Sequence, residues 1–174
     1  MELRLDLHIH SERSFDGCMS LSEIVALARE RGLNGVAICD HDRVLDEVPE
    51  FDDFLVIPAT EVSTERGHLL GLFVREPIET RKFSESVTVI HAQGGLAVIA
   101  HPFEHSTDAN RLDDVMSRLD GVEIWNSRAD RKNKSANAMA RECWKRTSCR
   151  FPPSRQRSCG AQSRSKAAVA AQCA

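Results

Sequence analysis

The sequence lacks the features that mark membrane proteins, secreted proteins and many nucleotide-binding enzymes. No apolar run reaches the roughly 18 residues that a transmembrane helix needs. The first residues are acidic and begin a strand-like alternation at once, so we expect no signal peptide, no membrane partner and a cytoplasmic location. Glycine-rich phosphate loops of the Walker or dinucleotide-binding type are missing as well. What remains is a globular chain of 174 residues, long enough for one domain with a core.

The last part of the chain lacks whole classes of residue. Residues 143–174 contain seven Lys and Arg but no Asp, Glu, Leu or Ile, and they hold four of the six cysteines. Residues 1–142 contain 16 Lys and Arg against 26 Asp and Glu, so the charge changes sign at this boundary. A segment so poor in large apolar residues cannot offset its ordering entropy. We therefore divide the chain into an acidic α/β body, 1–142, and a basic low-complexity tail, 143–174, which we expect to be disordered. We expect all six cysteines of the chain to be reduced thiols.

Short apolar runs alternate with amphipathic stretches along the body, which favours a largely parallel sheet covered by helices. The expected strands cover 3–8, 35–39, 54–57, 68–74, 96–100 and 122–125, and helical spacing covers 20–32, 84–94, 112–119 and 136–143. Polar residues of the ligand type fall at or just past the strand ends or, for Glu61, in a turn: His8, His10, His41, Glu61, His101 and Asn126. In a β/α barrel, the carboxyl ends of the strands meet on one face and form the active site.

A metal site is the chemistry that this pattern favours. His8 and His10 stand two residues apart at a strand end, so both imidazoles project to the same side and can hold one Zn²⁺, Mn²⁺ or Fe²⁺ ion. Further His and carboxylate residues join them near strand ends or turns: Asp16, His41, Glu61, His68 and His101. A mixed set without paired cysteines suits a hydrolytic site with open positions better than a structural zinc site.

These segments resemble the PHP domain, the polymerase and histidinol phosphatase superfamily. The resemblance extends in order over 1–142 and is carried by Asp6-Leu7-His8-Ile9-His10-Ser11, Ser14-Phe15-Asp16-Gly17, Cys39-Asp40-His41-Asp42, Pro58-Ala59-Thr60-Glu61-Val62, Gly67-His68-Leu69-Leu70-Gly71, Ile99-Ala100-His101-Pro102 and Gly121-Val122-Glu123-Ile124-Trp125-Asn126. It implies a distorted (β/α)7 barrel with up to three divalent metals that hydrolyses phosphoesters. Many small members resemble phosphatases or exonucleases that act on short nucleotides.

The resemblance also implies roles for individual residues. His8 and His10 would hold one metal, Glu61 would bridge it to a second metal on His68 and His101, and Asp16 and His41 would hold the third. Asp16, His41 and Glu61 are accordingly the expected catalytic residues. The implied substrate is a small phosphomonoester or the end of a short nucleotide, and we expect no stable protein partner.

Several other residues carry weaker expectations. Arg128 and His105 are candidates for binding the substrate phosphate, since an Arg fork matches phosphate oxygens. Asp6 and Asp40 either orient imidazoles or serve in strand-end solvation or turn capping. Asn126 and Glu123 flank a position that sometimes supplies another ligand, and a structural hydrogen bond is the alternative for Asn126.

One part of the family pattern is missing. The pattern ends in an Asp-x-His pair on the seventh strand, which supplies a ligand to the first and third metals, but no Asp follows Asp130 and no His follows His105. We therefore expect an incomplete barrel of about six strands without its closing strand, fewer than three metals and impaired activity. A change of reading frame after about Glu142, or a truncated terminus, would explain the loss. The alternatives are a non-catalytic relative that binds metal weakly and an amidohydrolase-type reaction on the same metals.

Overall fold

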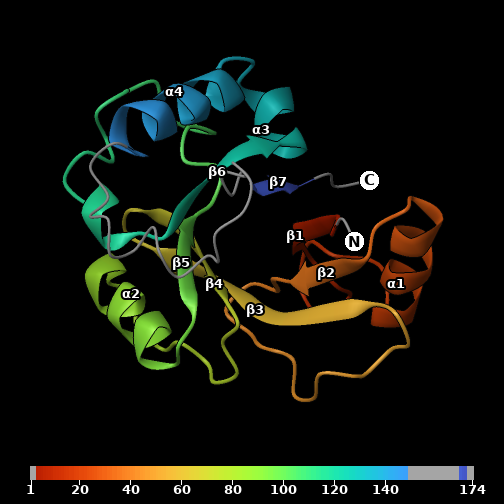
Figure 1. Cartoon of the computed structure of the whole chain (residues 1–174). Coiled ribbons are helices and arrows are strands. Elements are labelled where there is room, and N and C mark those ends of the chain that lie inside the picture. Colours follow the sequence, from red (N-terminus) through yellow and green to blue (C-terminus); the bar gives the residue numbers. More distant parts are fainter. Residues whose placement is uncertain (1–2, 149–168, 172–174) are drawn as a thin grey trace.

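The computed structural model describes residues 3–148 and 169–171, and its strands form one curved sheet with the helices around it (Figure 1). The strands are β1 (Leu5–Ile9), β2 (Gly35–Ile38), β3 (Leu55–Thr64), β4 (Gly67–Leu72), β5 (Leu96–Ile99), β6 (Gly121–Asn126) and β7 (Val169–Ala171). The helices are α1 (Leu21–Glu30), α2 (Phe83–Ala92), α3 (Ser127–Lys132) and α4 (Ala136–Ser148), with a short 3₁₀ helix at Met116–Arg118. The body thus supplies six strands of an open, incomplete α/β barrel, as the sequence predicts.

The strands follow one another across the sheet in chain order, but one of them runs the other way. β1, β2 and β3 are parallel, and so are β5, β6 and β7, whereas β4 is antiparallel to both β3 and β5. The sheet is therefore largely parallel, as predicted, and β4 is the exception. Only Glu65 and Arg66 separate β3 from β4, and so short a connection can join only antiparallel strands.

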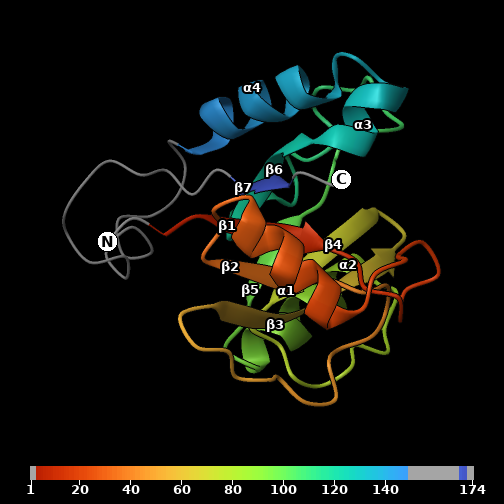
Figure 2. The same ribbon diagram turned by 90° about the vertical axis from the view of Figure 1, so that its right-hand side faces the viewer.

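The tail contributes more structure than its composition suggests. The sequence predicts a disordered segment from residue 143 onward and no closing strand, yet α4 runs to Ser148, and Val169–Ala171 pair with β6 as β7. Strand pairing is made by backbone groups, which small residues such as Ala can supply without an alternating pattern. Figures 1 and 2 both place this short strand between β6 and β1. The rest of the predicted disorder, at 149–168 and 172–174, lies outside the described residues.

The apolar positions of the body form the core largely as expected. α1 begins with a capping box of Ser20 and Glu23 and packs its buried face on β2 and β3 (Figure 2). The predicted helix at 112–119 is wrong, because only Met116–Arg118 is helical, although its apolar side chains are buried. Inside the sheet, small and medium side chains such as Ala37, Ala59 and Leu70 form a closely packed layer.

No helix in the described ranges combines the length and the apolar character needed to cross a membrane. The three cysteines within those ranges, Cys18, Cys39 and Cys143, are free thiols.

Candidate metal centre

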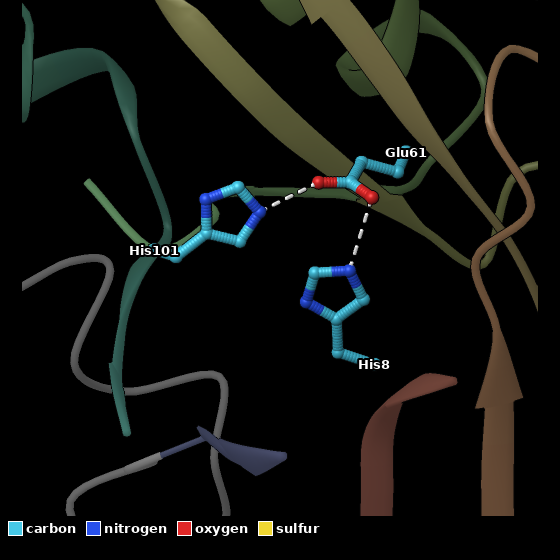
Figure 3. Close-up of side chains that lie close together, drawn as sticks. All are labelled: His8, Glu61 and His101. Atoms are coloured by element: carbon cyan, nitrogen blue, oxygen red, sulfur yellow. Dashed lines mark hydrogen bonds and ion pairs between the residues drawn. The ribbon is translucent and has the colours of Figure 1, made fainter. Parts of the chain in front are cut away.

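Glu61 stands at the middle of the site, with imidazoles on both of its carboxylate oxygens. Its side chain is 1% exposed and comes from within β3, not from the turn that the sequence suggested. The Oε2 atom lies 3.1 Å from His8 Nε2, 2.9 Å from His10 Nε2 and 3.5 Å from His41 Nε2. The Oε1 atom lies 2.8 Å from His68 Nδ1 and 2.9 Å from His101 Nε2. Figure 3 shows His8 and His101 approaching Glu61 from different segments of the chain.

The sheet explains why residues so distant in sequence meet here. His8 lies near the carboxyl end of β1, and His101 follows the end of β5. Backbone hydrogen bonds from Glu61 N–H to Asp40 O and from Asp42 N–H to Glu61 O hold the segment of His41 against β3. His68 comes from the beginning of β4, which lies at the same end of the sheet because β4 is antiparallel.

Asp16 reaches the site from the loop after β1. His10 Nδ1 donates to its Oδ1 at 2.7 Å, while His41 Nε2 lies 3.5 Å from its Oδ2. Both terminal nitrogens of Arg128 donate to the same Oδ2, each at 3.0 Å. The loop depends on Gly17, because a Cβ there would lie 2.0 Å from the carbonyl oxygen of Ser11. All seven predicted metal ligands are therefore brought together around Glu61 and Asp16.

Two buried carboxylates orient the imidazoles of His8 and His101 by binding the ring nitrogens that face away from Glu61. His8 Nδ1 donates to Glu123 Oε1 at 3.1 Å, and the backbone N–H of His101 donates to Glu123 Oε2 at 2.6 Å. His101 Nδ1 donates to Glu104 Oε2 at 2.9 Å, and Lys132 pairs with the other oxygen of Glu104. Sequence reasoning placed Glu123 only as a neighbour of a possible ligand and missed Glu104. The one available signal for Glu104 is a carboxylate three residues after a candidate ligand.

Asp40, Asp6 and Asn126 have structural hydrogen bonds. Asp40 accepts from the backbone N–H and the hydroxyl of Ser11, both at 2.6 Å, which favours the turn-capping interpretation. Asp6 accepts from the backbone N–H of His8. Asn126 caps α3 by accepting from Ala129 N–H, which favours the structural alternative stated for it.

The charges around Glu61 change the protonation of the site. Burial opposes protonation of His101, but hydrogen bonds with Glu104 and Glu61 outweigh it and raise its pKa to about 9. Burial likewise opposes the raised pKa of His8, which the charges of Glu123 and Glu61 produce. For Glu61, the charge of His8 and the hydrogen bonds of the imidazoles outweigh burial and lower the pKa well below its usual range. In His41 burial dominates, and its pKa is lowered.

The donor set fits divalent cations of the zinc and manganese type. His8 Nε2 and His10 Nε2 lie only 3.1 Å apart, so the two rings aim nitrogens at the same small volume beside Glu61. The ligand atoms of His8, Glu61 and His101 lie within 4.8 Å of one another, and so do those of His10, His41 and Glu61. Imidazole nitrogens combined with a shared carboxylate are a set that Zn²⁺ and related ions accept.

A cavity of about 840 Å³ opens beside these residues. Its lining combines site residues with basic side chains of α3 and apolar side chains near α1, namely His8, His10, Asp16, Glu61, His101, Arg128, Arg131, Lys132, Ile9, Ile24 and Leu27 among others. Arg128 thus lines the same cavity as the candidate metal ligands. His105 is not among the lining residues of the described chain, and its exposed ring lies 3.5 Å from Glu104.

Phe15 is an aromatic residue at the site that sequence reasoning did not single out. It is 86% exposed and stacks on His41 with the ring centroids 4.7 Å apart. An exposed Phe whose other face is covered by a site imidazole offers a flat apolar surface next to the candidate ligands.

Comparison with known proteins agrees with the resemblance to the PHP domain. The family model for the PHP domain matches residues 6–99. An uncharacterized protein of Methanocaldococcus jannaschii is 33% identical over 144 residues, an alignment that covers 72% of this chain and 82% of that protein. A 5′-3′ exoribonuclease of Haemophilus influenzae is 38% identical over 81 residues, which cover 41% of this chain but only 29% of the enzyme.

A solved structure from Bifidobacterium adolescentis, named as a candidate metal-dependent phosphoesterase, matches with a TM-score of 0.60. The match covers 84% of each chain at 16% sequence identity, so it shows a shared fold.

Proposed function

Because the chain belongs to the PHP domain family, we propose that it hydrolyses a small phosphomonoester or the end of a short nucleotide with the help of divalent metals. The observation that carries this proposal is the convergence of five imidazoles on the two oxygens of Glu61, at a cavity that also holds Arg128. His8, Glu61 and His101 would hold one ion, and His10, His41 and Glu61 would hold an adjacent one. This grouping differs from the one that the resemblance implies, in which His8 shares an ion with His10, and His68 shares one with His101.

When bound, divalent ions would supply positive charge to a phosphoryl group and would lower the pKa of a nucleophilic water. The protein residues have separate tasks. Glu61 contacts His8 and His101 through Oε2 and Oε1, and it contacts His10 and His41 through Oε2, so its carboxylate would take part in both positions and balance the charge of the cations. The planar fork of Arg128 can bind two phosphate oxygens at once, and in this structure its interaction with Asp16 holds it at the site.

The organic part of the substrate would occupy the remaining cavity and rim. The apolar side chains of Ile9, Ile24 and Leu27 exclude water from one wall of the cavity. The exposed face of Phe15 supports a substrate with a flat ring, because base stacking on an aromatic side chain contributes about 1–3 kcal/mol. A nucleotide end agrees with the name of the H. influenzae relative.

The absence of an Asp-x-His pair after residue 130 supports a reduced rate. In the resemblance that pair completes two of the three metal positions, so this chain has fewer ligands than the family pattern provides. We propose that it works with the positions built on Glu61, which are formed by residues 8–101.

Metal analysis and a phosphatase assay on the full chain test this proposal. The protein is stripped with a chelator, reloaded with Mn²⁺ or Zn²⁺, and assayed on p-nitrophenyl phosphate, a nucleoside 5′-monophosphate and a short oligonucleotide. We expect bound metal and metal-dependent release of phosphate or of terminal nucleotides. His10→Ala should lose activity, whereas the matched His91→Ala should keep it, since His91 pairs with Asp120 away from the site.

The possible results separate the candidates. Bound metal without turnover on any phosphoester favours the non-catalytic relative. Turnover of a cyclic amide in place of phosphoesters favours the amidohydrolase-type reaction. A chain that binds no metal refutes the proposal.

A further inference from the structure

The two metal positions share Glu61, but their imidazoles are held in different ways. In the position of His8, Glu61 and His101, here called position A, the outer nitrogen of each imidazole donates to a buried carboxylate. Glu123 accepts from His8, and Glu104 accepts from His101. Such a bond fixes the tautomer that leaves Nε2 free for a cation and fixes the direction in which the ring points.

The position of His10, His41 and Glu61, here called position B, has less support. The outer nitrogen of His41, Nδ1, is buried and has no hydrogen-bond partner among the described residues. The outer nitrogen of His10 is held by Asp16, but the guanidinium of Arg128 binds that same carboxylate. Only one imidazole of position B is therefore oriented, and the carboxylate that orients it is shared.

The charges of the surrounding side chains also favour a cation at position A over one at position B. Glu104, Glu123 and Glu61, all at most 7% exposed, surround position A, and Lys132 offsets one of them. Position B has Glu61 and Asp16, and Arg128 offsets the second of these. A cation at position A thus faces a larger excess of negative charge in a more buried environment, where electrostatic attraction is stronger.

The backbone adds a further constraint at position A. His101 has φ of +24°, in a region that residues other than glycine rarely adopt. Its N–H donates to Glu123 at 2.6 Å and its ring donates to Glu104, so two carboxylates hold the residue in this conformation. A strained residue kept by specific contacts is a common feature of functional sites.

We propose that Glu104 and Glu123 are positioning residues which make position A bind its metal first, and that position B binds only after it and more weakly. This proposal rests on the metal-binding part of the proposed function. It also assigns α3 a role in metal binding, because Lys132 fixes Glu104, and Asn126, the N-cap of α3, donates to Glu123.

Calorimetric titration of the metal-free full chain with Zn²⁺ tests the order without any measure of activity. We expect two separate binding steps in the wild type. Glu104→Ala should weaken the first step roughly tenfold to a hundredfold, the usual effect of losing a partner of a ligating histidine. Glu104→Gln keeps an acceptor for His101 and should weaken that step less. His41→Ala should remove the second step and leave the first unchanged.

Asp120→Asn is the matched control, because it removes the carboxylate of a similar pair, His91–Asp120 at 2.7 Å, outside the metal centre. It should change neither step. Circular dichroism melts of each variant show whether it is folded, and His41→Ala tests the order even if Glu104→Ala does not fold.

Three results would overturn the proposal. Loss of the first step in His41→Ala would show that position B fills first. Two equal steps, or an unchanged first step in folded Glu104→Ala, would refute the positioning role while leaving metal-dependent function intact. A wild-type chain that binds no Zn²⁺ would refute both the order and the proposed function.

Discussion

The acidic body and the basic tail differ in how far the sequence pattern predicts their structure. In the body, residues 1–142, apolar periodicity predicts most strands and places the polar residues at their ends, where they meet at Glu61. In the tail, 143–174, no such pattern exists, and its described contributions are the end of α4 and the short strand β7. The difference teaches that a metal site requires particular side chains at particular positions. A strand at a sheet edge, by contrast, requires only the hydrogen-bonding groups of its backbone.

Replacing Glu61 should have the largest effect on the body. Glu61→Gln keeps the size of the side chain but removes the charge that both metal positions share. We expect loss of bound metal at both positions, a larger loss than any single histidine substitution causes. Elemental analysis after reloading with Mn²⁺ measures it.

The control for that variant is Glu142→Gln, an exposed carboxylate on α4 that pairs with Lys145. It should keep the metal content of the wild type. If Glu61→Gln does the same, Glu61 does not bridge two ions.

Much of this site is predictable from the sequence because its ligands lie beside strands. His8 and His10 share a face through strand alternation, and His41 and His101 each follow an apolar run. The outer carboxylates are not predictable in this way. Glu123 reaches His8 across 115 positions of sequence, and Glu104 reaches His101 through a turn in which His101 has positive φ. Such contacts depend on how strands and turns are placed in space, which periodicity does not encode.

The fold, like the site, has features that the sequence predicts and features that it does not. Apolar runs locate β1, β2, β5 and β6, but the direction of β4 depends on a two-residue connection with weak turn signals. That reversal is what brings His68 to the site, so the error in strand direction concerns function as well as topology.

The second prediction tests whether the geometry of the loop that carries Asp16 affects metal binding as much as the identity of the ligands does. Gly17→Ala adds a Cβ that would lie 2.0 Å from the Ser11 carbonyl oxygen, so the loop that carries Asp16 must move. We expect weaker binding of the second Zn²⁺ ion and a normal first one, since Asp16 orients only His10. Calorimetric titration checks this.

Gly32→Ala is the control, because a Cβ there has open space around it, although the residue has positive φ. It should lower stability slightly without changing either binding step. Equal binding by Gly17→Ala and the wild type would mean that the loop does not position Asp16.

The third prediction concerns the pH dependence of the metal-free body. The pKa of His101 is about 9 in the folded chain against an ordinary value of 6.5, and that of His8 is raised too. Groups with raised pKa values add stability that is complete below pH 6.5 and is lost as the pH rises through 9. We expect the Tm of the metal-free chain to fall over this interval.

His101→Gln should flatten this fall, whereas His91→Ala should leave it unchanged. Metal affinity should change in the opposite direction, rising with pH, because bound protons compete with the ion for the imidazole nitrogens. A Tm that is constant or rises from pH 6.5 to pH 9 contradicts the protonated state assigned to His101.

The smallest effect should come from removing the part of the tail that follows α4, residues 149–174. A chain that ends at Ser148 keeps α4 and every residue of both metal positions, but it loses β7 and its pairing with β6. Three residues of strand pairing contribute on the order of 2 kcal/mol, so the Tm should drop by only a few degrees. The exposed edge of β6 should also make the shortened chain more prone to aggregate, because unpaired strand edges pair with other copies. Both zinc-binding steps should persist with unchanged affinities.

Limited trypsin digestion of the full chain provides the complementary measurement, since the tail carries Lys and Arg throughout, and we expect trimming to stop near residue 145. Loss of either zinc step on truncation would show that the tail takes part in the metal centre and that the division into a functional body and a dispensable tail is wrong.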